Sequence, residues 1–198
     1  MIAHDEGRAW LLLRDGGTPI AAFGDKERAF AAMLPLYAEL QQGEAARADE
    51  HLAHGVPDVR VERLPAFYGD LSARNDLPLA PDELAHLRGF ASEFERLCAD
   101  LPPLPPTVQH DDLHAGNVTA RDGRLLVLDW GDTSISHPLF SLVIAHWNGE
   151  PFDSYLEPWG DAAESLFRIR DAMTQDKDER AEFDEWFPKM LRKALEQL

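Results

Sequence analysis

A short polar segment between two apolar stretches carries most of the side chains that could do chemistry. Within eight positions it holds two histidines, two aspartates and an asparagine: His110, Asp111, Asp112, His114 and Asn117. Two further carboxylates, Asp129 and Asp132, follow a second apolar run. Carboxylate and amide oxygens are the ligands that Mg²⁺ prefers, and a loop carboxylate can accept a proton from a hydroxyl group. The segment therefore indicates magnesium-assisted chemistry on a phosphate-bearing substrate.

A predicted β-hairpin brings the two halves of this set together. Apolar runs at 117–121 and 124–130 flank Asp122-Gly123, a dipeptide typical of a tight turn in which both residues have positive φ. A hairpin that turns there brings Asn117 opposite Leu128 or Asp129. We therefore expect Asn117 and Asp129 to be neighbours that could share one Mg²⁺. With Asp112 to receive a hydroxyl proton, the set has the composition of a kinase catalytic centre.

The remaining elements are predicted to be mostly helical. The apolar run Ala9–Arg14, which ends at Asp15-Gly16-Gly17, predicts one buried strand and a turn. Apolar residues at helical spacing predict a helix over 25–42, with a kink at Pro35 and a stop at Gly43. Further helices are predicted over 44–53, 81–100, 138–147 (capped by Ser136), 159–172 and 178–198. This order predicts an α+β, mainly helical fold without a repeating βαβ pattern.

Charge and composition exclude several classes of function. The chain has 198 residues, with 19 basic and 36 acidic side chains and a net charge of −17. Such acidity opposes binding to nucleic acid or to an anionic membrane, and it is compatible with a cationic small substrate. The single cysteine, Cys98, excludes an intramolecular disulfide framework and a cysteine-cluster metal site. The sequence shows no membrane span and no signal peptide, so we expect a cytoplasmic protein.

The motif at 110–117, H-x-D-L-H-x-G-N, is followed by the hairpin and by L-D-W-G-D at 128–132. Together they resemble the catalytic and metal segments of the aminoglycoside phosphotransferase/choline kinase-like family. The resemblance implies a protein-kinase-like fold with ATP and Mg²⁺ as cofactors. It implies that Asp112 is the catalytic base and that Asn117 and Asp129 are the Mg²⁺ ligands. It also implies that His110 and His114 shape the catalytic loop.

The resemblance extends to the N-terminal segment. Trp10–Gly17 is similar to the last strand of the family's N-terminal lobe and to the hinge, whose backbone faces adenine. The resemblance therefore implies nucleotide contacts at Leu13, Arg14 and Asp15. We expect residues 1–17 to form a residual N-lobe strand and hinge, and residues 18–198 to form a helical C-terminal lobe.

The sequence also departs from the family pattern. No Gly-rich loop precedes the first predicted strand, and none of the four lysines lies on an apolar strand. We therefore expect most of the N-lobe to be missing. Asp111 stands where the family often has glycine. Ser136-His137-Pro138 and Ser141 stand where it often has Gly-Asp-Pro and a downstream aspartate.

Three functions follow as hypotheses. The first is an ATP-dependent phosphotransferase that acts on a hydroxyl of a small molecule, with activity that needs a second lobe. The second is a non-catalytic remnant that serves as a binding or self-associating module, as a homodimer or with an N-lobe partner, because apolar groups near Trp10–Leu13 would lie on an open strand edge. The third is a metal-dependent phosphohydrolase that uses His110-Asp111, which the hairpin context argues against.

Overall fold

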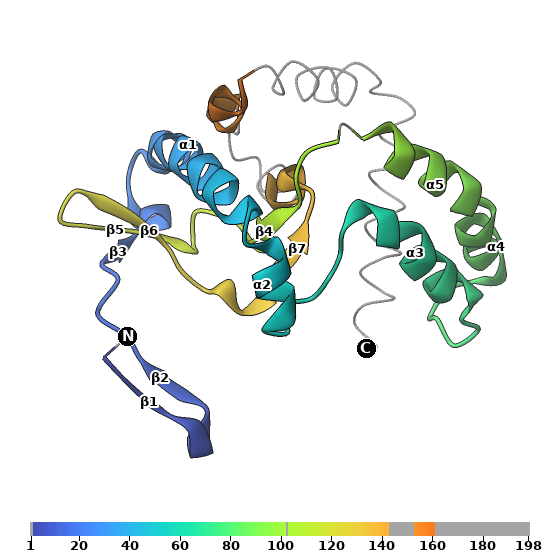
Figure 1. Ribbon diagram of the computed structural model, residues 1–198, viewed down its shortest axis with the longest axis horizontal. Coiled ribbons are helices and arrows are strands. Elements are labelled where there is room, and N and C mark those ends of the chain that lie inside the picture. Colours follow the sequence, from blue (N-terminus) through green and yellow to red (C-terminus); the bar gives the residue numbers. More distant parts are fainter. Residues whose placement is uncertain (1, 102, 143–152, 161–198) are drawn as a thin grey trace.

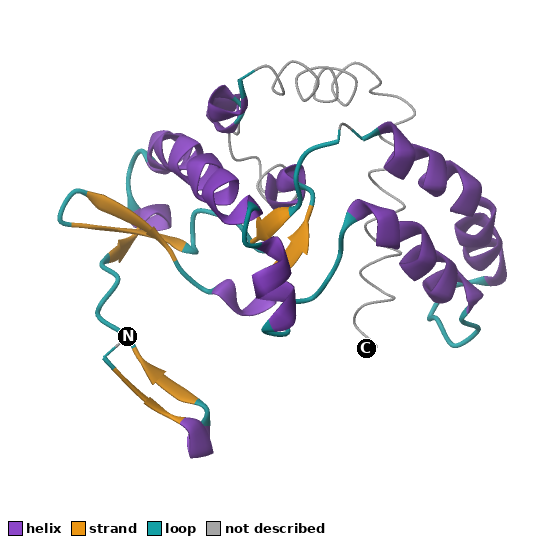
Figure 2. Cartoon of the chain, in the orientation of Figure 1, coloured by secondary structure: helices purple, strands orange, loops and turns teal. Residues whose placement is uncertain are grey.

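The computed structural model describes residues 2–101, 103–142 and 153–160. Over these residues the predicted fold class is confirmed: the chain is α+β and mainly helical, with small antiparallel sheets (Figure 1, Figure 2). The helices are α1 (Lys26–Ala45), α2 (Ala48–Ala53), α3 (Leu64–Ala73), α4 (Pro81–Gly89) and α5 (Ala91–Asp100). The strands are β1 (Ala3–Asp5), β2 (Trp10–Leu12), β3 (Thr18–Pro19), β4 (Thr107–Gln109), β5 (Val118–Arg121), β6 (Arg124–Val127) and β7 (Ser134–Ser136). Short 3₁₀ turns join them: η1 (Glu6–Arg8), η2 (Ile20–Ala22), η3 (Val61–Arg63), η4 (Trp130–Asp132), η5 (Pro138–Phe140), η6 (Asp153–Tyr155) and η7 (Glu157–Trp159).

Helix α1 is the centre of the main core. It buries Phe30, Met33, Leu34 and Tyr37 against the start of β5 and against η6. Pro35 lies inside the helix, so the carbonyl of Ala31 loses its usual N–H partner four residues on. The Ser154 hydroxyl, brought in by η6, donates to that carbonyl at 2.7 Å. The helix therefore continues through the proline. It also runs past the predicted stop at Gly43 and ends at Ala45.

The predicted hairpin is confirmed as β5 and β6. Val118 pairs with Val127 and Arg121 with Arg124, and the turn residues Asp122 and Gly123 have φ of 51° and 74°. β3 adds a third strand beside β5. A separate two-stranded ribbon pairs β4 with β7, in register from Thr107–Ser136 to Gln109–Ser134. The chain leaves β4 directly into the polar segment and returns from the hairpin through η4 into β7 (Figure 1).

Helices α3, α4 and α5 form a separate group with a small core of Tyr68, Leu77 and Leu87 (Figure 1). The sequence did not predict α3, which begins with Leu64-Pro65. The single helix predicted over 81–100 is two helices that meet at Phe90. Gly89 weakens the helix there, and the Phe90 ring packs 6.3 Å from the Tyr68 ring in the group's core.

The N-terminal segment differs from the expected single buried strand. β1 and β2 form a two-stranded hairpin that projects away from the other elements (Figure 1). Large apolar side chains on it are exposed, including Trp10 at 67% and Leu11 at 66%. The prediction of a buried strand is wrong because an apolar run alone does not show whether a second layer covers the strand.

The remaining predictions concern the segments after η5. The helix predicted over 138–147 begins as η5, and the side chain of His137, rather than Ser136, accepts a hydrogen bond from the Leu139 N–H at 3.3 Å. Its later part, and nearly all of the helices predicted over 159–172 and 178–198, lie outside the described residues. Within the described ranges, no helix is both long and apolar enough to cross a bilayer.

Candidate active site

The polar segment begins with a strained turn. The N–H of Asp112 donates to the carbonyl of His110 at 2.7 Å, which closes a three-residue turn around Asp111. Asp111 has a φ of 56°, in the left-handed region that side chains with a Cβ rarely adopt. Glycine would take this conformation without strain, which accounts physically for the glycine that the family often has here. The turn directs two successive carboxylates into different surroundings.

The Asp111 carboxyl lies in the less exposed of these surroundings. Burial raises its pKa, and the nearby Asp132 carboxylate acts in the same direction. A hydrogen bond with Ser134 and the charge of His110 partly oppose this shift. Asp111 is therefore a poorly solvated carboxyl that faces η4 and β7 rather than a free surface charge.

We call the polar run 110–117 the candidate catalytic segment. His110 joins this catalytic segment to the hairpin. Its imidazole is fully buried, and Nε2 lies 2.6 Å from the carbonyl oxygen of Leu128. A carbonyl can only accept, so Nε2 carries the proton. The ring also packs edge-on against Trp130, with centroids 4.9 Å apart. His110 thus contacts the chain on both sides of Asp129, and its role in shaping the catalytic loop stays a prediction.

Asp112 and Asn117 are joined directly. The Asn117 amide donates to the Asp112 carboxylate oxygen Oδ2 at 2.9 Å and to the Asp112 carbonyl at 3.0 Å. His114 lies on the same side, with Nε2 3.5 Å from Oδ2 of Asp112. The N–H of Gly116 donates to Nδ1 of His114 at 2.9 Å, so in the neutral ring Nε2 holds the proton and faces the carboxylate. Oδ2 of Asp112 is therefore held by two neighbours, while Oδ1 has no partner in the described part of the chain.

Asp129 lies next to this group through the hairpin register. The N–H of Leu128 donates to the carbonyl of Asn117 at 2.8 Å, so Asn117 is opposite Leu128 and one position from Asp129. Asp129 is exposed and left-handed, with φ 63° and ψ 57°, at the point where β6 passes into η4. Its carboxylate makes no hydrogen bond or ion pair with any described residue.

These donors fit a magnesium ion. Because Nδ2 of Asn117 is bound to Asp112, its Oδ1 is the atom left for a cation, and the Asp129 carboxylate is open. An amide oxygen plus a carboxylate is a partial set of the kind Mg²⁺ uses when phosphate oxygens and water complete its shell. The described residues contain no cluster of three or more His, Cys, Asp and Glu that could hold a metal ion without such help.

The residues predicted to contact the nucleotide lie beside the same hairpin. The Asp15 carboxylate accepts from the N–H of Gly17 at 3.0 Å, and its carbonyl accepts from Arg121 at 2.6 Å. The Gly16 carbonyl accepts from the Thr119 hydroxyl at 2.7 Å, and a Cβ on Gly16 would lie 2.9 Å from a methyl of Leu128. Leu13 and Arg14 are exposed. The segment is therefore tied to β5 near Leu128, and its nucleotide contacts stay a prediction.

Sequence reasoning missed a buried polar group behind the segment. Five buried side chains, each at most 1% exposed, are linked by hydrogen bonds: Tyr37, Gln41, Gln109, Ser141 and Tyr155. Helical spacing predicts Tyr37 on the apolar face of its helix, and Ser141 differs from the family pattern without any sign of its partner. A glutamine on the same face, Gln41, four residues after Tyr37, was the one feature of the sequence that could have indicated buried hydrogen bonds there.

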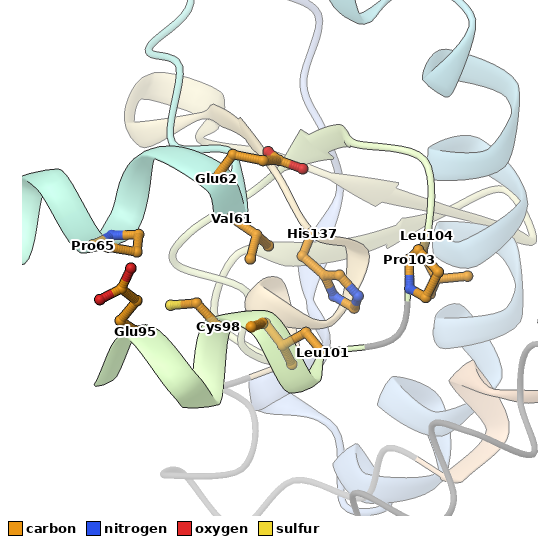
Figure 3. A pocket seen from close by; sticks show the side chains of 10 residues that line it. Val61, Glu62, Pro65, Glu95, Cys98, Leu101, Pro103, Leu104 and His137 are labelled. Carbon is orange, nitrogen blue, oxygen red and sulfur yellow. The ribbon is translucent and has the colours of Figure 1, made fainter. Parts of the chain in front are cut away.

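A surface pocket of about 340 Å³ lies elsewhere in the molecule (Figure 3). It is lined by the start of α3, the end of α5, the connector before β4, and His137. Leu104 and His137 flank the Thr107–Ser136 end of the β4–β7 ribbon, whereas the catalytic segment leaves from the Gln109–Ser134 end. The pocket is therefore separate from the group around Asp112.

One comparison with known proteins, the match to a family model, agrees with the motif. The model of the phosphotransferase enzyme family (APH) matches residues 2–194. A search of curated proteins finds no match. Among solved structures, the chain is similar to the apoenzyme of macrolide 2'-phosphotransferase MphH from Brachybacterium faecium, with 16% identity and a TM-score of 0.49 over 80% of this chain. The match covers 53% of that protein, so the chain spans about half its length. From the family match over nearly its whole length, the chain belongs to the phosphotransferase enzyme family.

Proposed function

We propose that this chain carries the catalytic and metal-binding segments of an ATP-dependent phosphotransferase that acts on a hydroxyl of a small molecule. One observation carries the proposal: a side-chain hydrogen bond of 2.9 Å joins the carboxylate of the candidate base, Asp112, to the amide of the candidate metal ligand, Asn117. This contact leaves Oδ1 of each residue open, one for a hydroxyl proton and the other for a cation. The two functions are therefore fixed relative to each other.

The geometry supports the following roles. The acceptor hydroxyl attacks the γ-phosphorus of ATP, the bond to ADP breaks, and the hydroxyl proton passes to Oδ1 of Asp112. Asn117 and Asp129 would hold Mg²⁺, which supplies positive charge to the transferring phosphoryl group when it is bound. His114 holds the other oxygen of Asp112. Leu13, Arg14 and Asp15 would meet the nucleotide beside the hairpin.

The charge of the chain and its family support one class of acceptor. The net charge of −17 favours a neutral or cationic acceptor over an anionic one. Macrolides, aminoglycosides and choline-like alcohols all offer hydroxyl groups together with an amine. We propose an amine-bearing alcohol of this kind as the substrate class.

A transfer assay tests the proposal. The protein is incubated with ATP labelled at the γ-phosphate, with Mg²⁺ or with a chelator, against a panel of amine-bearing alcohols. We expect a labelled acceptor that forms only with Mg²⁺. A protein that neither binds Mg²⁺-ATP nor labels any acceptor, alone or as a self-associated species, would contradict the proposal.

A specific observation favours a second candidate, a self-associating or partner-binding module. Ile2, Trp10, Leu11, Leu12 and Leu13 are each more than half exposed on or next to the β1–β2 hairpin. Such a strand pair can add to a sheet of a second copy or of an N-lobe partner. Light scattering tests this: a concentration-dependent dimer that Leu11→Ser disrupts would support it, and a monomer at all concentrations would contradict self-association.

A further inference from the structure

The main-chain N–H of His110 is buried beside two hydroxyl groups from distant parts of the chain. The Tyr37 hydroxyl on α1 lies 3.1 Å from this nitrogen, and the Ser141 hydroxyl after η5 lies 3.2 Å from it. The two hydroxyls are 2.6 Å from each other. The N–H is therefore shared between two acceptors, at the point where β4 enters the catalytic segment.

The direction of each hydrogen bond in this group is fixed by its partners. The main-chain N–H of Ser141 can only donate, and it lies 3.1 Å from Oε1 of Gln109, which sets the orientation of that amide. The Ser141 hydroxyl also donates to Oε1, at 2.7 Å. Its single proton is then used, so Tyr37 must donate to Ser141. The lone pairs of Tyr37 are left to receive the N–H of His110.

Further hydrogen bonds hold Gln109 and the carbonyl of the neighbouring Val108. Nε2 of Gln109 donates to the Thr107 carbonyl at 3.0 Å and to the Ser136 carbonyl at 3.3 Å. Nε2 of Gln41 donates to the Val108 carbonyl at 2.8 Å. Burial raises the pKa of the Tyr37 hydroxyl above its ordinary value, so this group stays protonated. Tyr37, Ser141, Gln41 and Gln109 are uncharged and fully buried, and each of their polar side-chain atoms has a partner. The buried Nδ1 of His110, by contrast, has no hydrogen-bond partner among the described residues.

We propose that Tyr37 and Ser141 are positioning residues that hold His110, and through it Asp112, by sharing the main-chain N–H of His110. The connection to the base is short, because the carbonyl of the same residue accepts the N–H of Asp112 at 2.7 Å. His110 is thereby fixed at its N–H, its carbonyl and its ring. The strained turn at Asp111 needs such support, since nothing in its own backbone preference favours it.

The role of these residues in transfer rests on the proposed function. A buried N–H that loses both acceptors is costly, whereas loss of one leaves the other in place. Tyr37→Phe and Ser141→Ala should therefore each have a small effect, and the double variant a larger effect than the two combined. A displacement of the base by about 1 Å corresponds to a loss of roughly 100-fold in kcat.

The experiment compares wild type, both single variants, the double variant and Ser141→Thr, which keeps the hydroxyl. Thr107→Val is the matched control, because the Thr107 hydroxyl is equally buried, lies on the same strand and donates to α1 at 2.6 Å, but does not touch His110. We expect the double variant to lose about 100-fold in kcat with KM for ATP within threefold. We expect Ser141→Thr and Thr107→Val to keep kcat. Wild-type kcat in the double variant, or an equal loss in Thr107→Val, would overturn the inference.

A second readout does not depend on turnover. Amide hydrogen exchange at His110 and Asp112, followed by NMR, should be faster in the double variant than in wild type and unchanged in Thr107→Val. Unchanged exchange in the double variant would overturn the inference. A wild-type protein that transfers no phosphate but shows the expected exchange pattern would contradict the proposed function and leave the positioning contact supported.

Discussion

The catalytic segment and the N-terminal hairpin are opposite cases of a short strand that leads into a turn. The catalytic segment is polar, and its atoms are held by α1, by the residue after η5 and by the β5–β6 hairpin. The N-terminal hairpin is apolar, and its described hydrogen bonds run between its own strands or within its turn. The segment with fewer apolar side chains is thus the one built into the molecule. Specific partners for polar atoms, rather than apolar content, mark the part of the chain that must keep one geometry.

The largest expected effect tests whether the well-held catalytic segment supplies the proton acceptor for phosphoryl transfer. Asp112→Asn keeps the size of the side chain and removes the proton acceptor, so we expect kcat for phosphoryl transfer to fall by about 10²–10⁴-fold. Affinity for Mg²⁺-ATP should stay within about threefold, because Asn117 and Asp129 are unchanged. Asp122→Asn, in the turn of the same hairpin, is the matched control and should retain activity. Equal activity of Asp112→Asn and wild type would reject Asp112 as the base.

The next effect compares packing in the two regions. Phe30, on α1, is fully buried, whereas Trp10, on β2, is 67% exposed. We expect Phe30→Ala to lower the free energy of unfolding by about 3–5 kcal/mol and Trp10→Ala to change it by less than about 0.5 kcal/mol. Urea denaturation of both variants measures this. A loss above 2 kcal/mol for Trp10→Ala would show that the hairpin is covered in solution and would break the contrast.

The smallest effect concerns the strained turn. Burial raises the pKa of the Asp111 carboxyl in the folded state. Its contribution to stability is therefore complete below the ordinary aspartate pKa and is lost as the pH rises towards the raised value. We expect Asp111→Asn, which tolerates positive φ, to match wild type at acid pH and to be more stable at neutral pH by an amount on the order of 1 kcal/mol.

Denaturation curves across this pH range test the sign. Asp122→Asn serves as the control, because Asp122 is exposed and also has positive φ. If Asp111→Asn and wild type showed the same pH dependence, Asp111 would be solvated and the account of the turn would be wrong.

Local patterns in the sequence predicted the parts of the site that depend on neighbours along the chain. Asp122-Gly123 set the turn, and the turn set the pairing of Asn117 with Leu128. Contacts between distant segments were not predicted. Nothing near Tyr37 or Ser141 shows that they meet, because 104 positions separate them. The break at Phe90 and the exposure of Trp10 depend likewise on tertiary packing, which periodicity does not report.

The most direct test of the account is calorimetry of Mg²⁺-ATP binding to wild type and to Asp129→Ala. Asp129 is exposed and makes no hydrogen bond or ion pair with the described residues, so its loss should cost only the strain of an alanine at φ 63°, about 1 kcal/mol. If Asn117 and Asp129 hold the metal, wild type binds Mg²⁺-ATP and the variant loses at least about tenfold in affinity while it stays folded at the temperature of the measurement. Unchanged affinity in Asp129→Ala would contradict the metal assignment and, with it, the proposed site.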